Sequence, residues 1–395
     1  MQILQIVLTI VTTLLLITLL VFIHELGHFL AAKFFKTDVK EFAIGFGKRL
    51  VSREYKGTVY SIRMFPLGGF VELEGENKSI SPNSFRNKRA YQKIIILSAG
   101  VIMNLLLATV AMTIFLATNN YQFTIPALTE YNFRNTETSV RAFPLMVTEV
   151  AEDGNSVGQL NEGDSIIGIN NSRFDNYGEF KKLLEDNQGK LVNFEFLDLR
   201  EFSTYSREIK VGFKDEEGAI LNVGLFELNR TSSSISYPAF FLQYPRNLSS
   251  GVFLTADLTL YIPKALGEII GNSFRTGNFS ELGNSVGSPL QIVDNSNQII
   301  QAGAFQAFIP LAGLLSISLA IFNILPFPAL DGGQIVVVLI EKITRRKIPD
   351  ATLEKINMFG FIFLMGLGIL LIFKDFLQLN VLDKFGEFIQ NITQR

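Results

Sequence analysis

Residues 1–28 read MQILQIVLTIVTTLLLITLLVFIHELGH, an uncharged run that ends in the pattern His24-Glu25-Leu26-Gly27-His28. A helix needs about 20 mostly apolar residues to cross a bilayer. The run is long enough for that, and it carries two imidazoles and a carboxylate to its end. It lacks a basic start and a small-residue cleavage site. We therefore predict a retained transmembrane helix over residues 1–34.

Three more stretches lack charged side chains for long enough to matter, at residues 94–129, 295–330 and 356–373. The last is short for a span, and a buried soluble helix is its alternative. The fold class predicted is a polytopic α-helical membrane protein with four transmembrane helices. The three later ones are a helix at 94–118, a segment at 295–341 and a helix at 356–374, before a C-terminal tail at 375–395.

Charge predicts how these spans are oriented. Residues 33–93 carry 13 Lys and Arg against 6 Asp and Glu, whereas residues 119–304 carry 14 against 23. Basic loops favour the cytoplasmic side. We therefore expect the region 35–93 on the cytoplasmic side and residues 119–304 outside.

The exported segment contains a small α/β domain, predicted at residues 142–228. Short apolar runs at 145–147, 165–169, 191–197 and 207–213 read as strands, and residues 177–184 have helical spacing. This order, with GDSIIGINN in the middle, resembles a PDZ domain; another small β-rich domain is the alternative. Residues 229–294 are predicted as a linker followed by a membrane-surface helix.

The region 35–93 is predicted to form a membrane-associated β hairpin. Short strands at 45–47, 58–63 and 66–73 are separated by glycines. A hairpin with a free edge can add an extended peptide as an extra strand. A plain connecting hairpin is the alternative.

His24, Glu25 and His28 fit the pattern H-E-x-x-H, and these are the only two histidines in the chain. On a helix, positions i and i+4 share a face, so both imidazoles can bind one zinc ion. The glutamate between them can take a proton from water that the metal activates. Ionisable groups at membrane depth are costly and usually functional. A structural pair at a helix end is the alternative.

A catalytic zinc normally has three protein ligands and one open position. Asp331 is the only charged residue between Asp294 and Glu341. Prolines and glycines around it interrupt the helix, so its carboxylate can turn inward. We predict Asp331 as the third ligand; an ordinary Asp-Gly turn is the alternative.

Several other chemistries are excluded or disfavoured. The chain has no cysteine, so disulfides and thiolate ligands are excluded, and its net charge of −2 predicts no nucleic-acid partner. A serine hydrolase is disfavoured, because both histidines of the chain already belong to the H-E-x-x-H pattern. A catalytically dead scaffold that binds partners and a transporter with a metal-sensing site remain as rivals.

The motifs HELGHFLAAK and NILPFPALDGG together resemble the site-2 protease family, in its bacterial branch of regulator-of-sigma-E proteases. The resemblance implies zinc held by His24, His28 and Asp331, with Glu25 as general base. It implies that Asn323 contacts the substrate or the reaction centre. It also implies cleavage of single-span membrane proteins, such as anti-sigma factors or remnant signal peptides, in regulated intramembrane proteolysis.

The same resemblance implies a multi-pass protein of the bacterial inner membrane, in contact with lipid. The substrates would be trimmed first by an upstream site-1-type protease, and the PDZ region would filter untrimmed ones. The sequence departs from the family at Val101 and Gln334, and only one PDZ region is found. The edge strand expected to bind the substrate comprises Gly68, Gly69, Phe70 and Val71.

Overall fold

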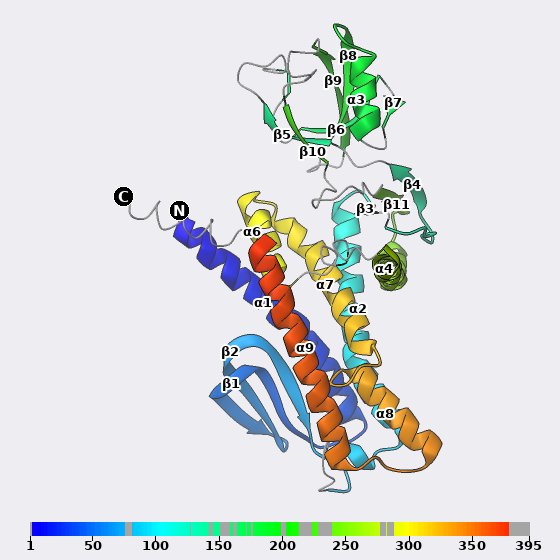
Figure 1. Cartoon of the computed structure of the whole chain (residues 1–395). Coiled ribbons are helices and arrows are strands. Elements are labelled where there is room, and N and C mark those ends of the chain that lie inside the picture. Colours follow the sequence, from blue (N-terminus) through cyan, green and yellow to red (C-terminus); the bar gives the residue numbers. More distant parts are fainter. Residues whose placement is uncertain are drawn as a thin grey trace. The chain divides into compact units, whose positions relative to one another are not determined.

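The computed structural model divides the chain into two compact units, Met1–Thr118 with Arg246–Arg395, and Asn119–Pro245. Figure 1 shows the helices and strands of both units. The structure describes residues 2–75, 81–126, 128–141, 145–150, 159–160, 164–170, 172–174, 177–198, 203–212, 223–227, 239–276, 282 and 288–378.

Four helices in the described part of the chain are long and apolar enough to cross a membrane. A helix suits a bilayer because it satisfies its own backbone hydrogen bonds. The length and composition of these helices confirm the prediction of four membrane-spanning helices. They are α1 (Gln2–Phe34), α2 (Ala90–Thr118), α7 (Phe308–Ile324, with the preceding turn Phe305–Ala307) and α9 (Asp350–Gln378).

The third predicted segment, 295–341, is interrupted before Asp331, as the prolines there indicated, and it has a second interruption that was not predicted. The structure divides the region into α6 (Pro289–Gln301), α7 and α8 (Asp331–Thr344). Gly303, at φ +65°, interrupts the chain after α6. Pro326, Pro328 and Ala329, which has φ +71°, separate α7 from α8. Only the middle piece has the length and hydropathy of a span.

Helix α2 packs against α1, α7, α8 and α4 (Ser249–Thr276). Its side chains Ile96, Ala108, Met112 and Leu116 are fully buried. In Figure 1, α4 is seen almost end-on while α2 runs lengthwise, so the two helices cross steeply. Gly251 of α4 is the close point, because a Cβ there would overlap Thr113. That α4 lies on a membrane surface stays a prediction.

Strands β1 (Val39–Tyr55) and β2 (Thr58–Leu73) form a long antiparallel hairpin instead of several short strands. Both strands bend back, so Ile44 pairs with Ile62 on one side and with Gly69 on the other. The first half of β1 therefore lies between the two halves of β2. This arrangement leaves residues 69–73 at an edge of the sheet. Hydrophobic contacts, including Phe42 with Phe22 and Phe29, pack the hairpin on α1.

The second unit contains a sheet with strand order β10-β5-β6-β8-β9, and β7 pairs with β6. Its core includes the fully buried Ile166, Phe180, Phe194 and Phe196. The elements are β5 (Leu145–Val150), β6 (Ser165–Ile169), β7 (Ser172–Arg173), α3 (Tyr177–Glu185), β8 (Leu191–Asp198), β9 (Ser203–Lys210) and β10 (Val223–Glu227).

A second sheet in this unit was not predicted. It has strand order β3-β11-β4, formed by β3 (Gln122–Pro126), β4 (Glu137–Arg141) and β11 (Ala239–Gln243). Phe240 pairs with Ile125 on one side and Val140 on the other. The prediction of a linker was therefore wrong at residues 239–243, because the short AFFLQ run gains its partners only from distant strands. The tail beyond residue 378 lies outside the described residues.

Candidate metal centre

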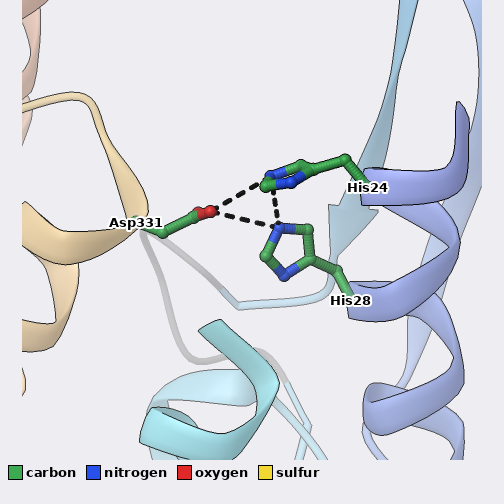
Figure 2. Close-up of side chains that lie close together, drawn as sticks. All are labelled: His24, His28 and Asp331. Carbon is green, nitrogen blue, oxygen red and sulfur yellow. Dashed lines mark hydrogen bonds and ion pairs between the residues drawn. The ribbon is translucent and has the colours of Figure 1, made fainter. Parts of the chain in front are cut away.

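His24 and His28 lie one turn apart on α1, and Asp331 opens α8. Figure 2 shows the three side chains pointing toward one another. The Nε2 atoms of the two imidazoles are 3.1 Å apart. Asp331 Oδ2 lies 3.1 Å from His24 Nε2 and 3.3 Å from His28 Nε2. The structure thus brings together the three residues that the sequence predicted as metal ligands.

The spacing of these three atoms fits a zinc ion. Ligands at 2.0–2.1 Å from a tetrahedral ion lie roughly 3.3–3.4 Å from one another. The observed separations of 3.1–3.3 Å agree with that value. Two imidazoles and one carboxylate leave a fourth position, as a catalytic zinc requires. Both histidines are buried, and the Asp331 side chain is 16% exposed.

The second nitrogen of each imidazole is also oriented. His28 Nδ1 donates to the Ile96 carbonyl oxygen at 2.8 Å. His24 Nδ1 lies 3.1 Å from Nδ2 of Asn104, which is fully buried on α2 and whose Oδ1 has no hydrogen-bond partner among the described residues. An imidazole that binds metal through Nε2 carries its proton on Nδ1, so the amide oxygen is the matching partner. Turning the Asn104 amide over exchanges its two terminal atoms and places Oδ1 at the Nδ1–H of His24.

Sequence reasoning missed Asn104. The available signal was an amide inside the apolar run 94–117, where it is the only Asn or Gln. Polar groups at membrane depth mark functional positions. Asn104 is further held by its neighbours, since Ser316 donates to its backbone carbonyl at 2.8 Å.

Gly100 lets α2 approach the two histidines. A Cβ at this position would lie 2.7 Å from His24 Cε1 and would overlap His28 Nε2. Atoms this close must shift, and a packed helix pair has little room to do so. Gly100 directly precedes Val101, one of the two positions at which the sequence departs from the family, and the sequence analysis gave Gly100 no role.

Asp331 is positioned by the close turn between α7 and α8. Gly332 lies against the carbonyl groups of Ile324 and Leu325, and Gly333 lies against that of Phe327. The prediction that these two glycines interrupt the helix was wrong. Both lie inside α8, where they permit close backbone contact. The Asp331 carboxylate sits in the first turn of α8, where the helix dipole favours negative charge.

Glu25 directly follows His24 in the sequence, and its side chain reaches the edge of the β hairpin. Its Oε2 accepts a hydrogen bond from the Val71 backbone N–H at 3.0 Å. The base predicted from the motif and the edge strand predicted from the glycines are therefore in direct contact.

A cavity of about 300 Å³ contains Glu25 together with the three ligand residues. Phe70 and Val71 from the edge strand also line it, as does Asn323, whose Nδ2 is 3.4 Å from His24 Nε2. Gly68 and Gly69 do not line this cavity. They allow the backbone of the edge strand to follow its course. Gly68 has φ +110°, and a Cβ at Gly69 would lie 2.5 Å from the Ala43 carbonyl oxygen.

Residues 12–367 match peptidase family M50, which covers most of the chain. The chain belongs to this family, the site-2 proteases. It is 30% identical over 372 residues to a Clostridium perfringens protein named "Putative zinc metalloprotease", covering 93% of this chain and 98% of that one. A Campylobacter jejuni protein of the same name is 29% identical, covering 92% of each chain. This M50 protein is a zinc-dependent metalloprotease with membrane-spanning helices.

Among solved structures, the M50 chain matches the PDZ domain of an SdrC-like protein from Listeria monocytogenes. The identity is 21%, the match covers 21% of this chain and 86% of that one, and the TM-score is 0.18. That residues 142–228 form a PDZ domain stays a prediction.

Proposed function

We propose that this M50 protein cuts peptide bonds within the transmembrane segments of single-span membrane proteins. One observation carries the proposal: His24, His28, Asp331 and Glu25 line a single cavity together with the edge of the β hairpin. Three of these four residues belong to α1, a helix apolar enough to span a bilayer. A transmembrane helix must unwind before its amides can be attacked. An edge strand stabilises an unwound segment by backbone hydrogen bonds.

In this proposal His24, His28 and Asp331 hold the zinc, which when bound supplies Lewis-acid activation of a water molecule and a peptide carbonyl. Glu25 accepts a proton from the attacking water at its carboxylate. It then delivers that proton to the nitrogen of the departing amide as the C–N bond breaks. Asn323 is placed to contact the reacting peptide from the opposite helix, α7.

The edge strand binds the substrate through backbone groups that face away from β1. Val71 N–H is such a group, since it points at Glu25 and not along the ladder. Side chains alternate along a strand, and so do its hydrogen-bonding directions. Gly69 N–H therefore faces the same side. The substrate lies as an added strand along residues 68–71, and Phe70 and Val71 border the cavity beside it.

The biological setting belongs to the same proposal. The protein acts in regulated intramembrane proteolysis in the bacterial inner membrane, with the hairpin on the cytoplasmic side and the PDZ-like region outside. Its substrates are anti-sigma factors or remnant signal peptides, trimmed first by a site-1-type protease. The charge asymmetry of the loops supports this orientation.

The test is to map where cleavage occurs. Purified protein in liposomes is mixed with a tagged single-span substrate, and the products are identified by mass spectrometry. The proposal expects cuts inside the apolar segment that a zinc chelator abolishes and added zinc restores. Cuts confined to the water-exposed flanks would contradict intramembrane cleavage, although the protein would still be a metalloprotease.

A further inference from the structure

A second cavity, of about 350 Å³, lies between α2 and α8, at the end of α8 that leads into the loop before α9. Figure 1 shows this end of α8 beside the start of α2. The cavity is separate from the metal centre, and the two share no lining residue. Its charged lining consists of five cations and one acid: Lys93, Lys342, Arg345, Arg346, Lys347 and Glu341.

The acids near this cavity are already engaged. Glu341 lies 3.8 Å from Arg86 Nη2 and 4.0 Å from Lys93 Nζ. Asp350 lies 2.8 Å from Arg86 Nη2. The exposed side chains of Lys342, Arg345, Arg346 and Lys347 form no ion pair with any residue that the structure describes. Clustered like charges on a concave surface concentrate a positive potential.

The basic loop is held in place over the cavity. Ile348 N–H donates to Glu341 Oε1 at 2.9 Å, and Arg86 Nη2 donates to the Ile348 carbonyl oxygen at 2.7 Å. Arg345 adopts a left-handed conformation with φ +54°, which turns the chain at the end of α8. A site whose backbone is fixed in advance loses less entropy on binding an anion.

Apolar surface adjoins the basic cluster. Ile343 is 79% exposed, and Leu339 and Ile340 of α8 are exposed as well. On α2, Tyr91 and Ile95 are exposed at the same end. Tyrosine is enriched at the boundary between headgroups and hydrocarbon. A soluble anion would use only the cations, whereas a phospholipid would use the cations and the apolar surface together.

We propose that this cavity binds the phosphate headgroup of an anionic phospholipid, whose acyl chains lie along the exposed apolar side chains of α2 and α8. Basic pockets between transmembrane helices recognise such headgroups. The inference rests on the membrane-spanning helices and is independent of the proteolytic reaction. Lipid binding can therefore be measured whether or not a substrate is known.

The test uses the full-length protein, stripped of lipid in detergent and titrated by native mass spectrometry. Phosphatidylglycerol is compared with phosphatidylcholine of the same chains, and glycerol phosphate serves as the free-phosphate competitor. The test variant is Arg345→Asn/Arg346→Gln/Lys347→Gln, with asparagine at 345 because it tolerates a positive φ. The matched control removes three exposed cations from the hairpin, as Lys48→Gln/Arg53→Gln/Lys56→Gln.

The wild type should prefer phosphatidylglycerol, and the test variant should weaken its binding about 100-fold, at about fivefold per basic side chain. The control should bind as the wild type does. Equal weakening in both variants, or equal binding of both lipids, would overturn the proposal. Competition by glycerol phosphate at lipid-like concentrations would show a free-phosphate site and also overturn it. Lys342→Gln, on the exposed face of α8, gives a milder variant that should weaken binding about fivefold.

Discussion

The Glu25 carboxylate accepts a hydrogen bond from the Val71 backbone N–H at 3.0 Å, which joins the HExxH helix to the edge of the β hairpin. The same stretch of strand that we propose to bind substrate therefore also positions the carboxylate that we propose as the base. A shift of the hairpin would move both together. This contact makes the base sensitive to whether the edge strand is correctly placed.

Val71→Pro should lower kcat about 10- to 100-fold while leaving zinc content unchanged. Proline removes the N–H that Glu25 accepts from, and hydrogen bonds to charged groups contribute about 1.5–3 kcal/mol. It removes no ladder hydrogen bond, because this N–H faces away from β1, and proline is tolerated at such edge positions. Cleavage rates and metal content of the purified variant measure the effect. Val71→Leu keeps the N–H and is the control; a Val71→Pro enzyme as active as Val71→Leu would show that the contact is dispensable.

Gly100→Ala should abolish zinc binding without unfolding the helices. The added Cβ would overlap His28 Nε2 and come within 2.7 Å of His24 Cε1, so at least one ligand must move. Overpacking of this kind typically lowers the free energy of unfolding by about 1–3 kcal/mol, so the helices should stay folded. Metal content by mass spectrometry and helicity by circular dichroism separate the two effects. Gly267→Ala is the matched control, because no atom lies within 4 Å of a Cβ at that position of α4. Full zinc content in Gly100→Ala would contradict the observed packing.

Asn104→Leu should weaken zinc binding about 10- to 100-fold, the usual effect of removing a partner of a metal-bound histidine. The buried amide lies 3.1 Å from His24 Nδ1 and fixes which ring nitrogen carries the proton. Competition with a chelator of known affinity measures the change. Asn104→Asp keeps an acceptor and should retain most of the affinity. If both substitutions weaken binding equally, the residue acts through packing and not through the hydrogen bond.

The hairpin should lose stability as the pH falls from about 4.5 to 2. Burial alone would raise the pKa of Glu41, but hydrogen bonds from Arg49, Ser61 and Arg63 outweigh it and lower the pKa from 4.5 to about 2. A carboxylate with a depressed pKa contributes stability above its unfolded pKa, and this contribution disappears as the native carboxylate is protonated. Hydrogen exchange of β1 and β2 as a function of pH reports it. Glu41→Gln should open faster at neutral pH and should flatten the pH dependence between 4.5 and 2; an unchanged profile would rule out this cluster as the cause.

The three residues of the candidate metal centre could be selected from the sequence because each had a local signature. His24 and His28 share a helix face by their spacing, and Asp331 is isolated in charge and flanked by helix-breaking residues. The structure brings them within 3.3 Å of one another. Asn104 and Gly100 were not recognised, because their importance comes from how closely α2 approaches α1. Distances between helices are not encoded in the spacing within either one.

The spans were predictable from hydropathy, but their internal breaks were less so. The break before Asp331 was predicted from its prolines. The break at Gly303 was not, because another glycine of the same uncharged run, Gly313, lies inside a helix. The strand at 239–243 escaped notice because it pairs only with residues about 100 positions earlier. The glycines of the hairpin located the edge strand, whereas its contact with Glu25 depends on tertiary packing.

The most direct test compares the wild type with Glu25→Gln in parallel preparations, measuring cleavage of a single-span substrate and zinc content in each. Glutamine has nearly the same shape but cannot accept the water proton, and the three ligand side chains remain. We expect Glu25→Gln to retain the zinc of the wild type and to lose cleavage. Cleavage that survives in Glu25→Gln with zinc bound would contradict Glu25 as the base and the reaction proposed here.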